Sequence, residues 1–218
     1  MNARDEILAN IRRATGGASA SREADYASIQ RDYHARGQMD ATDRVHLFMD
    51  RLHDYDAFVH RCSDSEISAA VEQALNARDK RSLLIPPSLP SQWLPGGFEF
   101  IPDHGLSFDQ IDRSEGVLTG CAVAIAVTGT IVLQHAADQA RRALTLIPDY
   151  HLCVVFENQI VETVPAGIHI MVDFAGSPIT TISGPSATAD IEMTRIKGVH
   201  GPRTLEVIIV ASGVLNLL

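Results

Sequence analysis

The chain has 218 residues, which suffices for one domain with a sizeable core and falls short of two full-sized domains. Its 45% hydrophobic and 21% charged residues match an ordinary globular protein and exclude a disordered or fibrous one. A formal net charge of -9, with no run rich in lysine or arginine, disfavours a surface that neutralises many phosphates. We therefore expect a globular protein that does not bind nucleic acid.

The first residues, Met1 to Glu6, are charged where a secretory signal would carry an apolar run. No later stretch reaches the about 18 consecutive apolar residues that a membrane span needs. The sequence therefore predicts a cytoplasmic protein without a membrane span.

The three cysteines, Cys62, Cys121 and Cys153, lie far apart along the chain and form no CxxC pair. Zinc and iron–sulfur sites use closely spaced cysteines and histidines. His135, His151 and His200 also lack metal-ligand spacing with one another. We expect reduced, mostly buried thiols, no metal site and no cofactor in this chain.

The chain opens with a short amphipathic helix that Asn2 can cap and that Gly16-Gly17 ends. Residues 18–40 are rich in serine, alanine and charge, with scattered apolar residues such as Tyr26 and Ile29. We predict an N-terminal helix and linker arm over 1–40, followed by one α/β domain over 41–218. The arm is expected to dock on a partner or on a second copy in a homo-oligomer.

The α/β domain starts with a helix over 43–52 and a short strand over 57–60. Ser63 or Asp64 caps the next helix, which runs through Ala77. An apolar run over 82–85 then ends at Pro86-Pro87, because proline cannot continue a sheet ladder. The order strand, helix, strand indicates an α/β fold.

The C-terminal half contains five further strand candidates. They are Gly116–Thr119, Gly129–Leu133, Leu152–Phe156, Ile179–Ile182 and Leu205–Ala211. The runs over 152–156 and 207–210 are continuously apolar, as expected for strands that are covered on both faces. A parallel or mixed sheet follows.

Two segments place glycine and polar residues directly beside these strands. The first reads Ala126-Val127-Thr128-Gly129-Thr130-Ile131-Val132-Leu133 and continues through Arg141-Arg142 to Tyr150-His151. The second reads Ser183-Gly184-Pro185-Ser186-Ala187-Thr188-Ala189-Asp190-Ile191-Glu192, followed by Lys197-Gly198-Val199-His200-Gly201-Pro202-Arg203.

Together these segments resemble the LUD-domain family, which includes lactate-utilisation and YkgG-type proteins. The opening Arg4-Asp5-Glu6-Ile7-Leu8 and the stretch 44–62 also fit, so the resemblance extends over nearly the whole chain. It implies a three-layer α/β fold with a mixed, mostly parallel sheet, similar to ribose-5-phosphate isomerase, glucosamine-6-phosphate deaminase and the CoA transferases (the NagB/RpiA/CoA-transferase-like group). One position departs from the family pattern, since Val127 replaces the glutamate of the usual Ala-Glu-Thr-Gly-Thr motif.

The resemblance further implies a role in the oxidation of L-lactate to pyruvate, alongside partner proteins of which at least one carries iron–sulfur clusters. The chain itself would be a non-redox accessory or substrate-handling subunit, because it lacks cluster-ligating cysteines. Two alternatives stay open: a free-standing enzyme of the isomerase or CoA-transferase type, and a regulatory module that binds an anionic ligand. No residue is assigned a catalytic role.

The glycine-rich loops predict a pocket for a small anionic ligand where they converge at one end of the sheet. Arg203 would bind a carboxylate, and the serine and threonine hydroxyls would add neutral hydrogen bonds. The candidate ligand-binding residues are Thr128, Gly129, Thr130, Ser183, Gly184, Ser186, Thr188, Asp190, His200 and Arg203.

Structural roles for the same residues stay open. Ser186 or Thr188 could cap a turn, Thr128 and Thr130 could bond strand-edge backbone groups, and His200 could hold its loop in place. Arg141 and Arg142 could contact an acidic ligand or form a solvated helix face.

Overall fold

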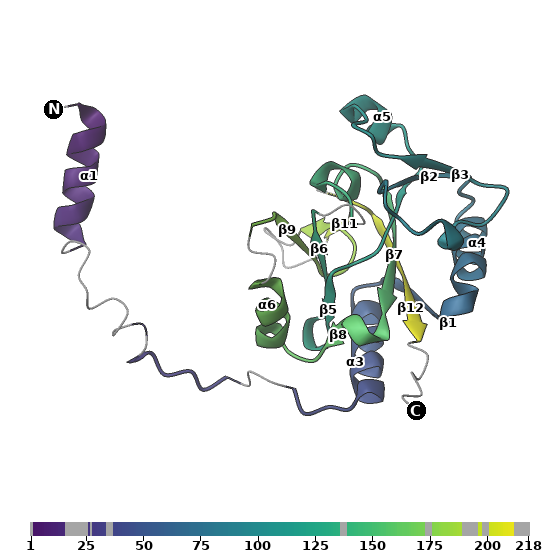
Figure 1. Ribbon diagram of the computed structural model, residues 1–218, viewed down its shortest axis with the longest axis horizontal. Helices are drawn as coiled ribbons and strands as arrows, with labels where there is room; N and C mark the ends of the chain where they lie inside the picture. The colour runs from purple at the N-terminus through teal and green to yellow at the C-terminus, as the bar shows by residue number, and fades with distance from the viewer. Residues whose placement is uncertain are drawn as a thin grey trace. The chain divides into compact units, whose positions relative to one another are not determined.

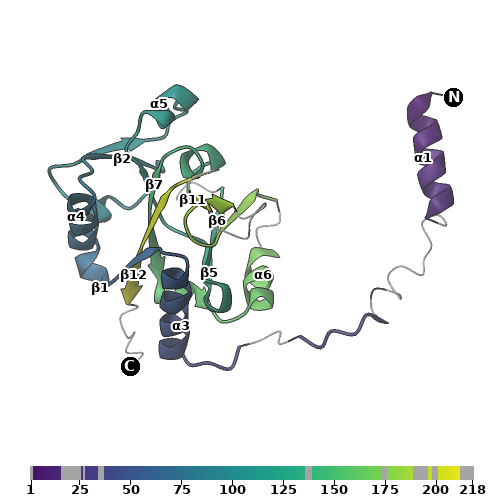
Figure 2. The same ribbon diagram turned by 180° about the vertical axis from the view of Figure 1, so that it is seen from behind.

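The computed structural model in Figure 1 and Figure 2 describes residues 2–15, 26, 28–33, 37–135, 139–172, 176–188, 196–197 and 201–211. Its contacts divide the chain into two units, residues 1–34 and 35–218. In the first unit, helix α1 (Ala3–Ala14) begins where the Asn2 side chain accepts a hydrogen bond from the Asp5 N–H at 2.9 Å. The predicted cap is therefore confirmed. Ile7 and Ile11 of this helix are exposed.

The second unit is built on a parallel sheet. In the described part of the chain this sheet has six strands, in the order β1-β12-β7-β4-β2-β3. Their bounds are Phe58–Ser63 (β1), Ser82–Ile85 (β2), Glu99–Pro102 (β3), Val117–Thr119 (β4), Tyr150–Phe156 (β7) and Thr204–Ala211 (β12). The α/β class and the mostly parallel sheet are therefore confirmed.

A smaller mixed sheet packs beside the parallel one. Within the described ranges its order is β8-β5-β6-β9, where β8 and β5 are parallel and the other pairs are antiparallel. The bounds are Val123–Ile125 (β5), Thr130–Gln134 (β6), Ile160–Val161 (β8) and Ile179–Ile182 (β9). Two further strands, β10 (Ala187–Thr188) and β11 (Ile196–Lys197), form an antiparallel pair.

Helices cover both sides of the parallel sheet. Helix α4 (Ile67–Ala77) packs on one face, and helix α3 (Ala41–Asp54) lies on the other face together with the smaller sheet. Helix α6 (Val164–Val172) packs on the outer face of the smaller sheet, and α5 (Phe108–Asp112) is a short helix before β4. Ser63 precedes a 3-10 turn (Asp64–Glu66), and its N–H donates to the Glu66 carboxylate at 2.9 Å. Helix α4 begins directly after this turn, so the cap predicted at Ser63 or Asp64 lies one turn before the α-helix itself.

The core is centred on β7 and β12, which Figure 1 and Figure 2 show side by side. Residues 152–155 and 205–210 are buried along their whole length, so the prediction that both faces are covered is confirmed. Alternate side chains pack against α3 and the smaller sheet on one face and against α4 on the other.

Several elements are absent from the sequence prediction, among them β3, β5 and α6. Strand β5 has three residues, which is too short for an alternating pattern to be recognised. Helix α6 is apolar nearly all round, and its Gly167 packs against Ile125 of β5, so its sequence lacks the polar face of an ordinary surface helix.

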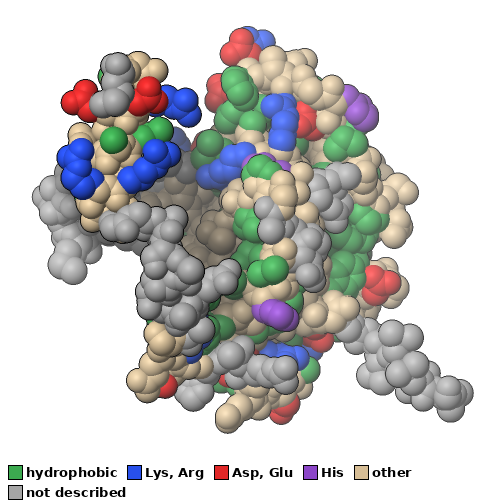
Figure 3. All heavy atoms as spheres, turned by 60° about the vertical axis from the view of Figure 1, so that its left-hand side comes forward, with side chains coloured by type: hydrophobic (Ala, Val, Ile, Leu, Met, Phe, Trp, Pro, Cys, Tyr) green, Lys and Arg blue, Asp and Glu red, His purple; other side chains and the backbone are tan. Residues whose placement is uncertain are grey.

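None of the helices in the described ranges is long and apolar enough to cross a membrane. On the face of the molecule shown in Figure 3, acidic and basic side chains are interspersed with hydrophobic ones.

A carboxylate is buried in the parallel sheet. Glu206 of β12 has a fully buried side chain, and its Oε2 accepts hydrogen bonds from Arg78 Nε and from the Tyr150 hydroxyl, both at 3.0 Å. His60 Nε2 contacts the other carboxylate oxygen. Burial, followed by the charge of Glu206, raises the pKa of Tyr150 above its ordinary value. Buried charges are tolerated when they are paired in this way.

We predict that Glu206→Gln lowers the free energy of unfolding by about 2 to 4 kcal/mol, because it removes the charge that Arg78 and His60 face in the protein interior. Urea unfolding at pH 7 measures this loss. The matched control is Asp54→Asn, which breaks the exposed pair with Arg51 and should cost less than about 0.5 kcal/mol. Equal losses in the two variants would contradict the prediction.

Candidate functional site

The first predicted motif joins the second through a chain of hydroxyl groups. Thr128 Oγ1 lies 2.7 Å from Thr130 Oγ1, which lies 2.8 Å from the Ser183 hydroxyl at the end of β9. Between the two threonines, Gly129 has a φ of 58° and approaches the backbone of Arg51 in α3. The structure therefore brings Thr128, Thr130 and Ser183 together, although they lie far apart in the sequence.

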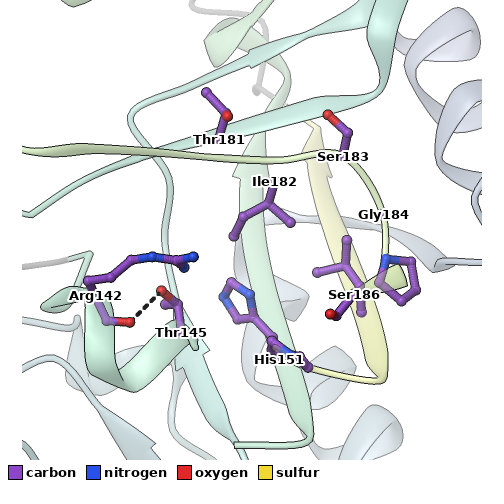
Figure 4. Close-up of a pocket in the computed structure, with 11 residues that line it drawn as sticks. Arg142, Thr145, His151, Thr181, Ile182, Ser183, Gly184 and Ser186 are labelled. Atoms are coloured by element: carbon purple, nitrogen blue, oxygen red, sulfur yellow. Dashed lines mark hydrogen bonds between the residues drawn. The ribbon is translucent and has the colours of Figure 1, made fainter. Parts of the chain in front are cut away.

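The second motif folds back on the start of β12. The Ser186 N–H donates a hydrogen bond to the Pro202 carbonyl at 2.8 Å, and Gly201 lies against the Ser186 side chain. Beside this contact is a cavity of about 140 Å³, shown in Figure 4. Of the candidate residues, Ser183, Gly184 and Ser186 line it.

Four of the other candidate residues do not line this cavity, and the remaining three fall outside the description. Thr128, Gly129 and Thr130 are not among the residues that line the cavity. Arg203 is largely exposed, and its Nε lies 3.5 Å from Asp149 Oδ1. Asp190, His200 and the Thr188 side chain lie outside the described part of the structure.

The cavity lies at the amino ends of the central strands. His151 and Leu205 are the second residues of β7 and β12, and both line it. The opposite wall comes from Thr181 to Ser183 of the smaller sheet and its following loop. The 3-10 helix η4 (Arg142–Thr145) leads toward β7 and contributes Arg142 and Thr145.

His151 is one of the residues lining this cavity that the sequence analysis did not select. Its side chain is fully buried, and its Nε2 lies 2.8 Å from the Thr119 hydroxyl. Its Nδ1 is also buried and has no hydrogen-bond partner among the residues that the structure describes. Buried polar atoms without a partner are rare in folded proteins, because such an atom gives up its hydrogen bond to water on folding and gains none in return. Burial lowers the pKa of His151 to about 4, so the ring is neutral near pH 7.

The neighbouring residues Arg141 and Arg142 have different surroundings. Arg141 Nε donates to Asp103 Oδ2 at 2.6 Å, and a second guanidinium nitrogen donates to Oδ1 at 3.1 Å. Arg142 takes part in none of the ion pairs among the described residues. Figure 4 shows its guanidinium group directed into the cavity, toward His151 and Ile182. Arg142 thus supplies positive charge at the place for which the sequence analysis proposed Arg203.

A second cavity, of about 350 Å³, lies at the carboxyl ends of the parallel strands. Its lining includes Trp93, Cys121 and Phe156, and the rings of Trp93 and Phe156 are 5.9 Å apart. Ligands of α/β sheets commonly bind at this edge. We nevertheless take the smaller cavity as the candidate site, because it combines a buried unpartnered nitrogen with an arginine that is free of ion pairs among the described residues.

The part of the chain that the structure describes contains no group of three histidine, cysteine or acidic side chains placed to hold a metal ion. The three cysteines, all within this part, form no disulfide, and Cys121 and Cys153 are buried.

Comparison with known proteins identifies the family. The chain is 43% identical to "Lactate utilization protein C" of Deinococcus radiodurans over 94% of each chain. It belongs to the LUD-domain family. The model of the LUD domain matches residues 108–210, a range that contains every residue lining the candidate cavity.

Two further relatives place this LUD-domain protein in context. The crystal structure of a DUF162 family protein from Deinococcus radiodurans is 45% identical, with a TM-score of 0.69, and covers 79% of this chain and 99% of that one. The "Uncharacterized protein YkgG" of Escherichia coli is 34% identical over 46% of this chain and 47% of that protein. The resemblance to the LUD-domain family is therefore confirmed, whereas the closer likeness to the isomerases and CoA transferases stays a prediction.

Val127 stands where the LUD motif commonly has glutamate. It is partly exposed, and its N–H donates to the Glu162 carbonyl at 3.1 Å. A valine side chain can neither transfer a proton nor attack a substrate. In this LUD protein the position therefore carries no acid, base or nucleophile.

We predict that Gly129→Ala lowers the free energy of unfolding by about 2 to 4 kcal/mol. An added Cβ would lie 2.8 Å from Arg51 Cβ, and the positive φ would add strain. The control is Gly96→Ala, whose Cβ would meet nothing within 4 Å and should change stability by less than about 0.5 kcal/mol. Chemical denaturation of both variants tests the contrast, and similar midpoints would contradict it.

We predict that His151 makes the protein less stable as the pH falls from 7 to 5. Its pKa is near 4 when folded and about 6.5 when unfolded, so over this interval only the unfolded chain takes up the proton. The resulting loss is roughly 2 kcal/mol. The His151→Gln variant lacks this titrating group. Between pH 7 and pH 5 its free energy of unfolding should therefore fall by roughly 2 kcal/mol less than that of the wild-type protein. If the free energy of unfolding changes with pH by the same amount in the two proteins, the buried ring of His151 is not the cause of the pH dependence.

Proposed function

We propose that this LUD-domain protein acts in L-lactate utilisation as a non-redox accessory or substrate-handling subunit that works with iron–sulfur partner proteins. The observation that carries the proposal is the 43% identity, over 94% of both chains, with a protein named for lactate utilisation. Identity of this extent, without large gaps in coverage, supports a shared role more strongly than a shared fold does.

The placement of the cysteines supports the assignment of the redox step to partner proteins. Cys62 ends β1, Cys121 follows β4, and Cys153 lies within β7. An iron–sulfur cluster is usually held by four thiolates from a closely spaced motif, which this chain does not contain.

The candidate cavity suits a small substrate or product. A cavity of about 150 Å³ can hold a molecule of benzene, and the cavity beside His151 measures about 140 Å³. Lactate and pyruvate have as many non-hydrogen atoms as benzene. Arg142 adds a positive charge, which favours a carboxylate.

We predict that deletion of the gene in its native host abolishes or strongly slows growth on L-lactate as the carbon source and leaves growth on glucose unchanged. Reintroduction of the wild-type chain should restore growth on L-lactate. Growth curves of the three strains on both carbon sources test this. Undiminished growth of the deletion strain on L-lactate would overturn the pathway assignment.

The accessory role has its own test. The purified chain, given L-lactate and an artificial electron acceptor, should reduce none of the acceptor. A tagged chain recovered from lactate-grown cells should bring with it proteins that carry cysteine-rich iron–sulfur motifs. Lactate oxidation by the purified chain alone would favour a free-standing enzyme instead.

A further inference from the structure

We infer that the second cavity, of about 350 Å³ at the carboxyl ends of the parallel strands, is a separate binding site for an aromatic group that carries no negative charge. It lies at the opposite end of the strands from the candidate site, which the amino ends of β7 and β12 line. The inference goes beyond the proposed function, because a small carboxylate such as lactate has no ring and carries a negative charge.

The cavity lies where the connections of two neighbouring strands diverge. After β2 the chain runs outward to β3, and this connection contributes Leu89 and Trp93 to the lining. After β4, the neighbour of β2, the chain runs to the other side, through the smaller sheet to β7, and contributes Gly120 and Cys121. Diverging connections at the carboxyl ends of adjacent parallel strands leave a crevice between them, and α/β proteins commonly bind ligands in that crevice.

Aromatic side chains form part of the cavity wall. The ring centroids of Trp93 and Phe156 are 5.9 Å apart, and their planes are tilted by 42°. A further ring can pack on such a pair in an offset or edge-to-face arrangement. Gly120 has no side chain to cover the Trp93 ring, since an added Cβ would lie 3.7 Å from the edge of that ring. The volume of the cavity is also within the range of small-molecule sites.

The charge of the lining selects against anions. Of the described residues that line the cavity, none is lysine or arginine, and Asp64, which follows β1, adds a negative charge. An anion that entered would lose hydration without a positive partner and would meet a like charge. An aromatic ammonium group would instead be attracted by Asp64 and by the ring faces. The candidate site has the opposite character, because Arg142 lines it.

Hydrogen bonds fix the wall between β4 and β7. The Gln159 amide group donates to the Cys121 carbonyl and accepts from the Phe156 N–H, both at 2.8 Å. Its oxygen also lies 3.4 Å from the Cys121 thiol, which donates to it. These bonds hold the connection after β4 against the end of β7. Because the wall is formed by the fold itself, little ordering of the protein opposes ligand binding.

Trp93 is the single tryptophan of the chain, so its fluorescence and its indole N–H signal in NMR spectra report directly on this cavity. Benzamide, benzylamine, benzoate and cyclohexanecarboxamide are titrated into the purified full chain at pH 7. Benzamide and benzylamine should change the Trp93 signals saturably. Benzoate should bind about tenfold or more weakly than benzamide, because no positive charge meets its carboxylate. Cyclohexanecarboxamide lacks the aromatic ring and should bind about threefold or more weakly.

Matched phenylalanine variants locate the site. Phe156→Leu should weaken benzamide binding about threefold or more, because it removes a ring from the cavity wall. Phe108→Leu changes an exposed ring on α5 outside the cavity and should leave the affinity within about twofold. Arg142→Gln, at the candidate site, should also leave it within about twofold. If Phe156→Leu does not fold, the four probes on the wild-type chain decide the question.

No saturable change at Trp93 with benzamide or benzylamine would overturn the inference. Benzoate or cyclohexanecarboxamide binding as tightly as benzamide would overturn it too, as would equal effects of Phe156→Leu and Phe108→Leu. These outcomes are independent of the growth test. A deletion strain that fails on L-lactate, with a chain that binds none of the four probes, would retain the proposed function and remove the inference.

Discussion

The alternation of side chains along the paired strands β7 and β12 is the constraint on which the rest of the structure depends. Both strands are buried on both faces, so every residue must suit the layer that it enters. The adjacent residues Tyr150 and His151 therefore point to opposite faces, Tyr150 toward the α4 side and His151 toward the smaller sheet. A slip of one residue in register would exchange them.

This alternation places two buried polar groups on opposite sides of one sheet. Glu206 is paired by Arg78, His60 and Tyr150, so its charge is compensated inside the protein. His151, which lines the candidate cavity, is bonded on one nitrogen, and its other nitrogen is buried without a partner among the described residues. The hydrogen bonds of Glu206 are thus made within the fold, whereas one ring nitrogen of His151 has none among the described residues.

The smaller sheet closes the cavity and holds its wall in position. The hydroxyl chain from Thr128 through Thr130 to Ser183 ties the turn between β5 and β6 to the end of β9. The Ser186 N–H ties the following loop to Pro202 before β12. The polar residues of the two motifs thus act first as connections between the two sheets, and Arg142 and His151 are further residues that line the candidate cavity.

The sequence by itself determined the features that depend on neighbours in the chain. The Asn2 cap, the bounds of Ile179–Ile182, the buried runs of β7 and β12 and membership of the LUD-domain family all follow from local pattern and motif. Only the tertiary structure decided that Arg141 pairs with Asp103 while Arg142 faces the cavity, and that His151 keeps an unpaired nitrogen. The contacts of Arg141 and His151 are with Asp103 and Thr119, which only folding brings beside them, so no local pattern records them.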